Sequence, residues 1–181
     1  MKQNRFFKMN IAFACLVFGL VTFTACTPAK VTAPSTFSDP FAYCSAVGNM
    51  DQPDASYSGP KMPEAVAKGL QKASGASADA PLELFVSNSF WRCMNGKIYA
   101  CFVGANLPCE SKANTDKTPT AAMAEYCTAN PTAENIPAVV TGHDTVYEWG
   151  CKDGKPEVIR QVLQVDERGF ISDIWYAIEK P

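Results

Sequence analysis

Cysteine carries the clearest chemical signal in this chain of 181 residues, which contains eight cysteines and a single histidine. Zinc and iron–sulfur sites usually show paired C-x-x-C spacings, which are absent, so neither a metal nor another cofactor is expected. The N-terminus indicates export, and an even number of cysteines in an exported domain predicts disulfide bonds. Six cysteines lie beyond the N-terminal segment, and the sequence leaves their connectivity open: Cys44, Cys93, Cys101, Cys109, Cys127 and Cys151.

Catalytic chemistry has few candidates in the sequence. His143 lies beside Asp144. In a catalytic pair the carboxylate must orient the histidine base, and two residues adjacent in the sequence cannot orient one another in this way. A Gly-x-Ser-x-Gly nucleophile motif and a phosphate-binding glycine loop are both absent from the sequence. The acids Asp166 and Glu167 occupy a predicted turn, where carboxylates are usually solvated. We therefore expect no catalytic residues, and His143 is the candidate if the protein is an enzyme.

Aromatic side chains offer a candidate binding surface. Trp91, Trp149, Trp175 and Tyr176 fall on predicted strands, where successive side chains point to opposite faces. A tryptophan or tyrosine exposed on one sheet face could stack on a sugar or on a protein partner. If helices and loops cover both faces, all four side chains belong to the core, and the sequence leaves both interpretations open.

The first 26 residues have the composition of an export signal: MKQNRFFKMNIAFACLVFGLVTFTAC. Lys2, Arg5 and Lys8 form a positive N-terminal region, and the stretch 9–23 is then almost entirely apolar. That stretch is shorter than the roughly 20 residues that span a bilayer, so a signal peptide over residues 1–25 is favoured over an uncleaved anchor.

The end of this segment, Phe23-Thr24-Ala25-Cys26, resembles the lipobox of bacterial prolipoproteins. The resemblance implies cleavage before Cys26 and acylation of that residue, which would anchor the protein to a membrane. Thr27 after the cysteine, by the same resemblance, implies the outer membrane with the protein facing the periplasm. Phe23 departs from the family, which usually has an aliphatic residue there, and cleavage at Ala25 with ordinary secretion is the alternative.

Composition separates a tether from a folded region. Residues 26–39 are rich in Thr, Ser, Ala and Pro without an apolar period, which predicts a flexible tether between the lipid and one globular domain over residues 40–181. The whole chain has a formal charge of −2. Beyond residue 25 it holds 13 cationic and 18 acidic residues, a charge of −5, so binding to nucleic acid is not expected.

Periodicity and turn residues predict the remaining elements. Residues 63–73 should form a short helix, and residues 82–86 a short strand or a packed loop. A polar loop over residues 104–117 is expected to be pinned by Cys109. A second helix should begin after Thr118 as N-cap, with Pro119 in its first position, and end at Asn130-Pro131.

Hairpins dominate the predicted β-structure. Asn95-Gly96 should turn a hairpin over residues 90–103, which puts Cys93 and Cys101 on opposite faces and forbids a bond between them. Three segments near the C-terminus, 145–151, 156–165 and 170–178, predict a meander. The motif W-x-C-x-[N/D]-G-K occurs at Trp91–Lys97 and again at Trp149–Lys155. One interpretation is that the chain contains two equivalent hairpins, each with a tryptophan beside a disulfide. The other is that two unrelated segments have converged on the same turn-forming residues.

These features together predict an α+β fold: an antiparallel sheet of about five strands with two short helices, stabilised by disulfides. Stretches such as FWRCMNGKIYACFVGANLPC are similar to exported bacterial proteins, but this resemblance implies no activity. We expect a non-catalytic envelope lipoprotein that binds a protein or glycan partner. The alternatives are a structural or assembly accessory protein, a protein resembling lysozyme inhibitors in layout, or an enzyme that uses His143.

Overall fold

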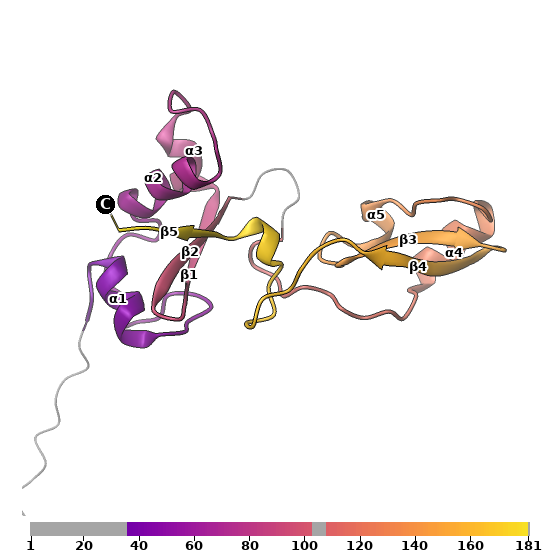
Figure 1. Cartoon of the computed structure of the whole chain (residues 1–181), viewed down its shortest axis with the longest axis horizontal. Helices are drawn as coiled ribbons and strands as arrows, with labels where there is room; N and C mark the ends of the chain where they lie inside the picture. The colour runs from indigo at the N-terminus through magenta and orange to yellow at the C-terminus, as the bar shows by residue number, and fades with distance from the viewer. Residues whose placement is uncertain (1–35, 103–107, 181) are drawn as a thin grey trace, which may run out of the picture. The chain divides into compact units, whose positions relative to one another are not determined.

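A computed structural model describes residues 36–102 and 108–180 of the chain (Figure 1). The expected signal peptide 1–25, Cys26 and most of the expected tether lie outside these residues. In the part of the chain that is described, no helix has the length and apolar character needed to cross a bilayer.

Groups of short helices precede each of the two hairpins along the described residues (Figure 1). In chain order the elements are α1 (Pro40–Val47), α2 (Glu64–Ala73), α3 (Leu82–Ser87), β1 (Ser89–Met94), β2 (Lys97–Phe102), α4 (Ala121–Ala129), α5 (Ala138–Thr141), β3 (Tyr147–Lys152), β4 (Lys155–Gln161), a 3₁₀ turn (Ser172–Ile174) and β5 (Tyr176–Ile178).

The strands form two antiparallel sheets, so the predicted α+β class with antiparallel pairing is confirmed. One sheet has the order β1-β2-β5 and the other contains β3 and β4. The predicted C-terminal meander is wrong, because β5 pairs with β2 rather than with β4. The reason lies in packing: Phe170 and Trp175 are buried in a cluster with Cys101, which brings the end of the chain to the free edge of β2.

Both predicted hairpin turns are present. Asn95 and Gly96 have φ of 54° and 75°, and Asp153 and Gly154 have 50° and 76°, which are the positive values that a two-residue type I′ turn requires. The register of the first hairpin pairs Cys93 with Ile98 and Phe90 with Cys101, as the turn predicts.

The three disulfides are Cys44–Cys93, Cys101–Cys109 and Cys127–Cys151. The prediction that these six cysteines pair is therefore confirmed, as is the prediction that Cys93 does not bond Cys101. Trp91 shares its buried cluster with Cys44–Cys93, and Trp149 shares another with Cys127 and Cys151. Each hairpin thus packs its tryptophan beside a disulfide.

The helices agree only in part with the sequence. The predicted helix 63–73 is confirmed as α2, but residues 82–86 form α3 rather than a strand, with Phe85 inserted into the core. Thr118 does not cap α4. Its N–H donates to the Asp116 carboxylate at 2.8 Å, and Thr120 is the N-cap, accepting from the Met123 N–H at 3.2 Å. Two short helices, α1 and α5, had no counterpart in the prediction.

Candidate functional site

A buried arginine organises one face of the three-stranded sheet. Arg92 of β1 is fully buried, and its guanidinium forms an ion pair with Asp166, whose side chain is 8% exposed. The guanidinium carbon lies 4.3 Å from the Phe170 ring centroid and 4.4 Å from that of Trp175. Aromatic rings and a carboxylate replace part of the hydration that a buried guanidinium loses, while its Nε has no hydrogen-bond partner among the described residues.

Asp166 also shapes the loop that carries it. One of its carboxylate oxygens accepts from the N–H of Arg168 at 2.8 Å and from the N–H of Phe170 at 3.0 Å. The expectation that this turn acid is solvated is therefore wrong, because Arg92 offers it a charge partner that no local sequence pattern indicates. The ion pair fixes the loop 166–170 against β1, and this loop forms part of a cavity wall.

That cavity has a volume of about 930 Å³ and lies beside the first half of β1. Four stretches that are distant in the sequence line it: parts of 49–61, the strand residues 89–91, and parts of 109–112 and of 168–175. The volume is within the range of small-molecule and peptide sites in proteins.

Aromatic rings make up much of the cavity wall, namely Tyr57, Phe90, Trp91, Phe170 and Trp175. Phe90 and Tyr57 are only half-buried, so part of each ring surface remains accessible. The Trp91 ring contacts Tyr57 edge-on at a centroid distance of 5.0 Å, and its indole N–H donates to the Lys61 carbonyl at 2.7 Å. These contacts hold the rings in fixed positions, as a preformed site requires.

Polar groups without partners gather at the same cavity. The hydroxyl of Tyr57, the hydroxyl of Ser89 and the indole N–H of Trp175 are buried and have no hydrogen-bond partner within residues 36–102 and 108–180. Ser89 and Trp175 are each 7% exposed. Burial, with a smaller effect of the Asp39 charge, raises the pKa of Tyr57, so its hydroxyl stays protonated. Unpaired buried polar groups are costly, so each of these three requires a partner that the described residues do not supply, such as a water molecule or a ligand in the cavity.

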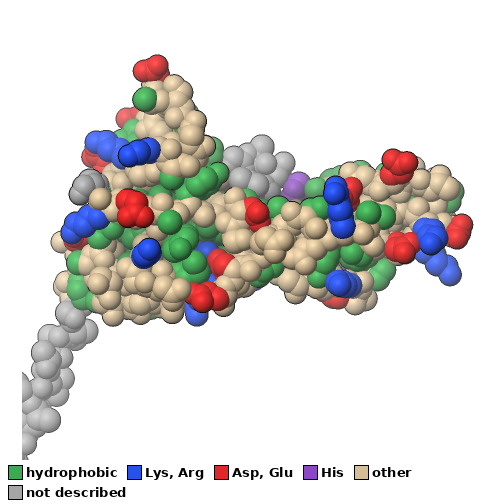
Figure 2. Space-filling model, in the orientation of Figure 1, with side chains coloured by type: hydrophobic (Ala, Val, Ile, Leu, Met, Phe, Trp, Pro, Cys, Tyr) green, Lys and Arg blue, Asp and Glu red, His purple; other side chains and the backbone are tan. Residues whose placement is uncertain are grey.

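Paired charges form the rim. Asp51 accepts from Arg168 Nε and Nη2 at 3.0 and 2.9 Å and from Lys112 Nζ at 2.6 Å. Burial alone would raise the pKa of Asp51, but the hydrogen bonds and positive charges of Lys112 and Arg168 outweigh it and lower that pKa. Lys112 Nζ also lies 3.8 Å from the Phe170 ring centroid. Charges of both signs are intermixed over the face of the molecule that Figure 2 shows.

The four predicted binding aromatics are placed in different surroundings. Trp91, Trp149 and Trp175 are buried, so they form no exposed stacking surface, and Tyr176 is half-buried on β5. Trp91 and Trp175 contribute to the cavity, whereas Trp149 belongs to the cluster around Cys127.

His143 is exposed at a shallow depression of about 520 Å³. Glu148 and Arg160 line the same depression but pair with each other at 2.6 Å, and no described residue makes a hydrogen bond to the imidazole. The imidazole is therefore not oriented by a carboxylate, as a catalytic base would be. Nor do the described residues bring three or more histidine, cysteine or acidic side chains into a metal-binding cluster.

Their proximity depends on the fold of distant segments, so no local pattern predicts that one region of the molecule brings together Arg92, Asp166, Ser89 and Tyr57. An arginine between Trp91 and Cys93 in a strand was the only available signal, since its neighbours mark a buried element. Comparisons with protein-family models, with curated proteins and with solved structures find no match to this chain.

Proposed function

We propose that the protein is a membrane-anchored lipoprotein of the bacterial envelope whose folded domain is a non-catalytic binding module. The positive N-terminal region, the apolar stretch and the lipobox-like sequence before Cys26 support the anchor. Three disulfides in one domain support an oxidising compartment outside the cytoplasm.

One observation carries the binding function: the aromatic cavity beside β1 holds three buried polar groups that have no partner among residues 36–102 and 108–180, on Tyr57, Ser89 and Trp175. Buried polar groups in native proteins nearly always have a hydrogen-bond partner, and a bound ligand would supply one to each of these three. Rings supply an apolar contact surface and the polar groups supply orientation, which is the usual division of labour in a binding site.

Site-specific crosslinking in intact envelopes tests this function. Gln52 is exposed and lines the cavity, whereas Gln164 is exposed and lies outside it, so a photoreactive amino acid is introduced at each position in turn. We expect a defined adduct from position 52 and none from position 164, with mass spectrometry giving its composition. Equal labelling from both positions, or none from either, would contradict the proposed site.

The anchor is tested on the same cells. Labelled palmitate should be incorporated into the wild-type chain and lost in Cys26→Ser, which should appear in the soluble fraction of the periplasm. Labelling that persists in Cys26→Ser, or that is absent from the wild type, would refute the anchor without bearing on the cavity.

A further inference from the structure

The cavity lies along an edge of the three-stranded sheet. In the order β1-β2-β5, β1 is an outer strand. A single residue of the preceding segment pairs with that outer edge: the Met50 N–H donates to the Cys93 carbonyl at 3.0 Å, and the Cys93 N–H donates to the Met50 carbonyl at 2.8 Å. The main-chain groups of Cys93 therefore point away from β2.

The direction of the main-chain groups alternates along β1, so the outward direction found at Cys93 recurs at every second residue. In an antiparallel pair the main-chain groups of every second residue point to the same side, and the β1–β2 register runs without a shift. Trp91 and Ser89 must then also direct their N–H and C=O groups outward. Neither residue makes a main-chain hydrogen bond beyond the strand pairing with any described residue. The edge from Ser89 to Trp91 is thus open in the sense that its main-chain groups are unpaired among the described residues. Ser89 and Trp91 are 7% and 3% exposed, and both line the cavity.

The second hairpin provides an internal comparison, because Trp149 and Cys151 occupy the motif positions of Trp91 and Cys93. There the chain covers both positions: the Cys151 N–H donates to the Ala133 carbonyl at 2.7 Å, and the Ile136 N–H donates to the Trp149 carbonyl at 2.7 Å. In the second hairpin the chain pairs with both motif positions of this edge, whereas in the first the described residues pair only with Cys93 and leave Trp91 unpaired.

We propose that the open edge of β1 accepts an extended peptide segment of an envelope protein, which adds as a further strand through the main-chain groups of Ser89 and Trp91. This inference rests on the proposed binding function and specifies its ligand. Main-chain donors and acceptors at strand spacing are complementary to another extended main chain. Met50 already occupies the neighbouring position in this way.

The cavity walls fit the side chains of such a peptide. Rings lie on both sides of the strand edge, with Tyr57 packed against Trp91 and with Phe170 beside Arg92 on the opposite sheet face. Successive peptide side chains point to opposite faces and would enter these two aromatic walls in turn. Charges of both signs at the rim, such as Lys61 and Glu110, suit the mixed charges of a polypeptide.

Amide hydrogen exchange tests the inference directly. The probes are peptides selected from a random phage-displayed library on the full mature chain, purified from membranes in detergent, and then synthesised. We expect the bound peptide to slow exchange of the Trp91 amide about tenfold. Arg92 is the matched control, since its amide already faces Tyr99 of β2 and should not respond. A peptide that binds and leaves Trp91 exchange unchanged would overturn strand addition.

N-methylation of the peptide gives a second measurement that does not alter the protein. Methylating one amide at a time should weaken binding about tenfold at every second position and have little effect between them, because only alternate amides face β1. Uniform effects, or none, would contradict strand addition.

A glycan ligand would give a different pattern. Neutral oligosaccharides are tested in the same assay with Ser89→Ala, which removes the hydroxyl and keeps the main-chain N–H. Peptide binding should survive this substitution. If an oligosaccharide binds and Ser89→Ala abolishes that binding, strand addition is wrong while the proposed binding function stands. If the library yields no peptide that protects Trp91, strand addition is also wrong, and crosslinking from position 52 decides the proposed function separately.

Discussion

The two hairpins of this protein share a motif and differ in what surrounds it. Trp91–Lys97 and Trp149–Lys155 have the same turn, with positive φ at both central residues, and each buries a tryptophan beside a disulfide. The residue between tryptophan and cysteine differs: it is Arg92 in the first hairpin and Gly150 in the second. The two hairpins have the same local structure, but the surroundings of the residue at this position differ.

At Arg92 the second face of the strand is packed against other parts of the chain. The guanidinium contacts the rings of Phe170 and Trp175 and pairs with Asp166, so the strand is buried on both faces. At Gly150 there is no room for a side chain, because an added Cβ would lie 2.9 Å from the Glu134 carbonyl oxygen. The main chain that crowds this glycine is the one that closes the edge of β3. A closed edge makes the second hairpin a structural element, while the first keeps an open edge beside a cavity.

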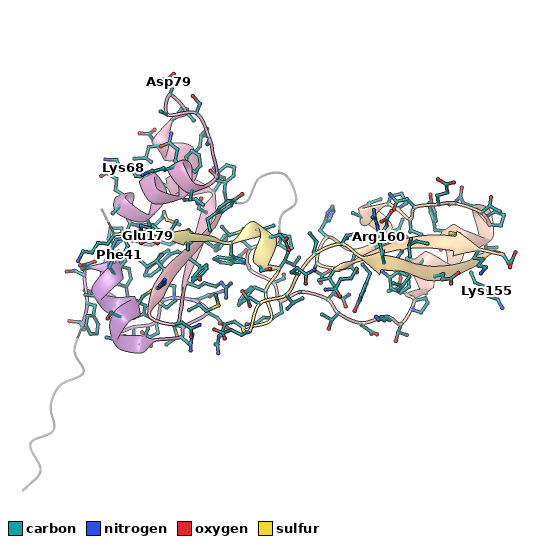
Figure 3. All side chains as sticks on the ribbon, viewed as in Figure 1. Phe41, Lys68, Asp79, Lys155, Arg160 and Glu179 are labelled. Carbon is teal, nitrogen blue, oxygen red and sulfur yellow. A yellow bond between two sulfur atoms is a disulfide. The ribbon has the colours of Figure 1, made fainter. Side chains whose placement is uncertain are left out.

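The largest expected effect comes from breaking the buried ion pair. Arg92→Ala leaves Asp166 buried without its charge partner, which should lower the free energy of unfolding by about 3–5 kcal/mol. The measurement is urea denaturation at neutral pH. Arg160→Ala is the control in the second hairpin. Arg160 lies on β4, where Figure 3 labels it, and it pairs with Glu148 but its side chain is 70% exposed. It should cost less than about 1 kcal/mol. Equal losses from the two substitutions would contradict the difference between the hairpins.

A smaller loss should follow when a side chain is added to the second hairpin. In Gly150→Ala the new methyl meets the Glu134 and Ala133 carbonyl oxygens at 2.9 and 3.2 Å and Ile159 Cδ1 at 3.0 Å. Overpacking of this kind costs about 1–3 kcal/mol, measured again by denaturation. The double variant with Ile159→Val should recover only part of the loss, since the main-chain contacts remain. Full recovery would show that Ile159 alone causes the crowding.

The turn glycines should behave alike in the two hairpins. Gly96 and Gly154 have φ of 75° and 76°, and an added Cβ at either position meets only ordinary contacts near 4 Å. Substitution by alanine should therefore cost about 1–2 kcal/mol in each case, from the left-handed backbone alone. Thermal unfolding of both variants measures this. A cost confined to one hairpin would show that tertiary contacts, not the turn, control that position.

The turn glycines of both hairpins are expected to respond only to local backbone geometry, and this dependence on local geometry explains why the hairpins could be predicted from the sequence. A type I′ turn depends on two adjacent residues, so Asn95-Gly96 and Asp153-Gly154 determine turn, register and the facing of the cysteines. The N-cap of α1 carried a local signal too: Asp39 before Pro40 accepts from the Phe41 N–H at 2.9 Å, although the helix was not predicted.

The remaining features depend on contacts between distant residues. Whether residues 176–178 pair with β2 or with β4 depends on the burial of Phe170 and Trp175 around Arg92, which no local pattern expresses. The cavity likewise requires three separate stretches of chain to meet at β1. The proposed binding site lies at that meeting point, and this is why the sequence motif shared by both hairpins does not reveal which of them carries the cavity.

The smallest effect concerns the charged rim of the cavity beside the first hairpin. Asp51 has its pKa lowered in the folded state, because Lys112 and Arg168 outweigh the opposing effect of burial. The carboxylate therefore stabilises the fold at pH values above its unfolded pKa of about 3.9, and this contribution disappears as the pH falls through the lower folded pKa. Its size should be about 1 kcal/mol or less, since the Asp51 side chain is 33% exposed. Denaturation of the wild type and of Asp51→Asn should give a constant difference between pH 7 and about pH 5, which then shrinks below about pH 4. A difference that persists unchanged to the lowest pH would mean that the Asp51 contacts act through shape rather than charge, and the rim would then be a packing feature like the edge of the second hairpin.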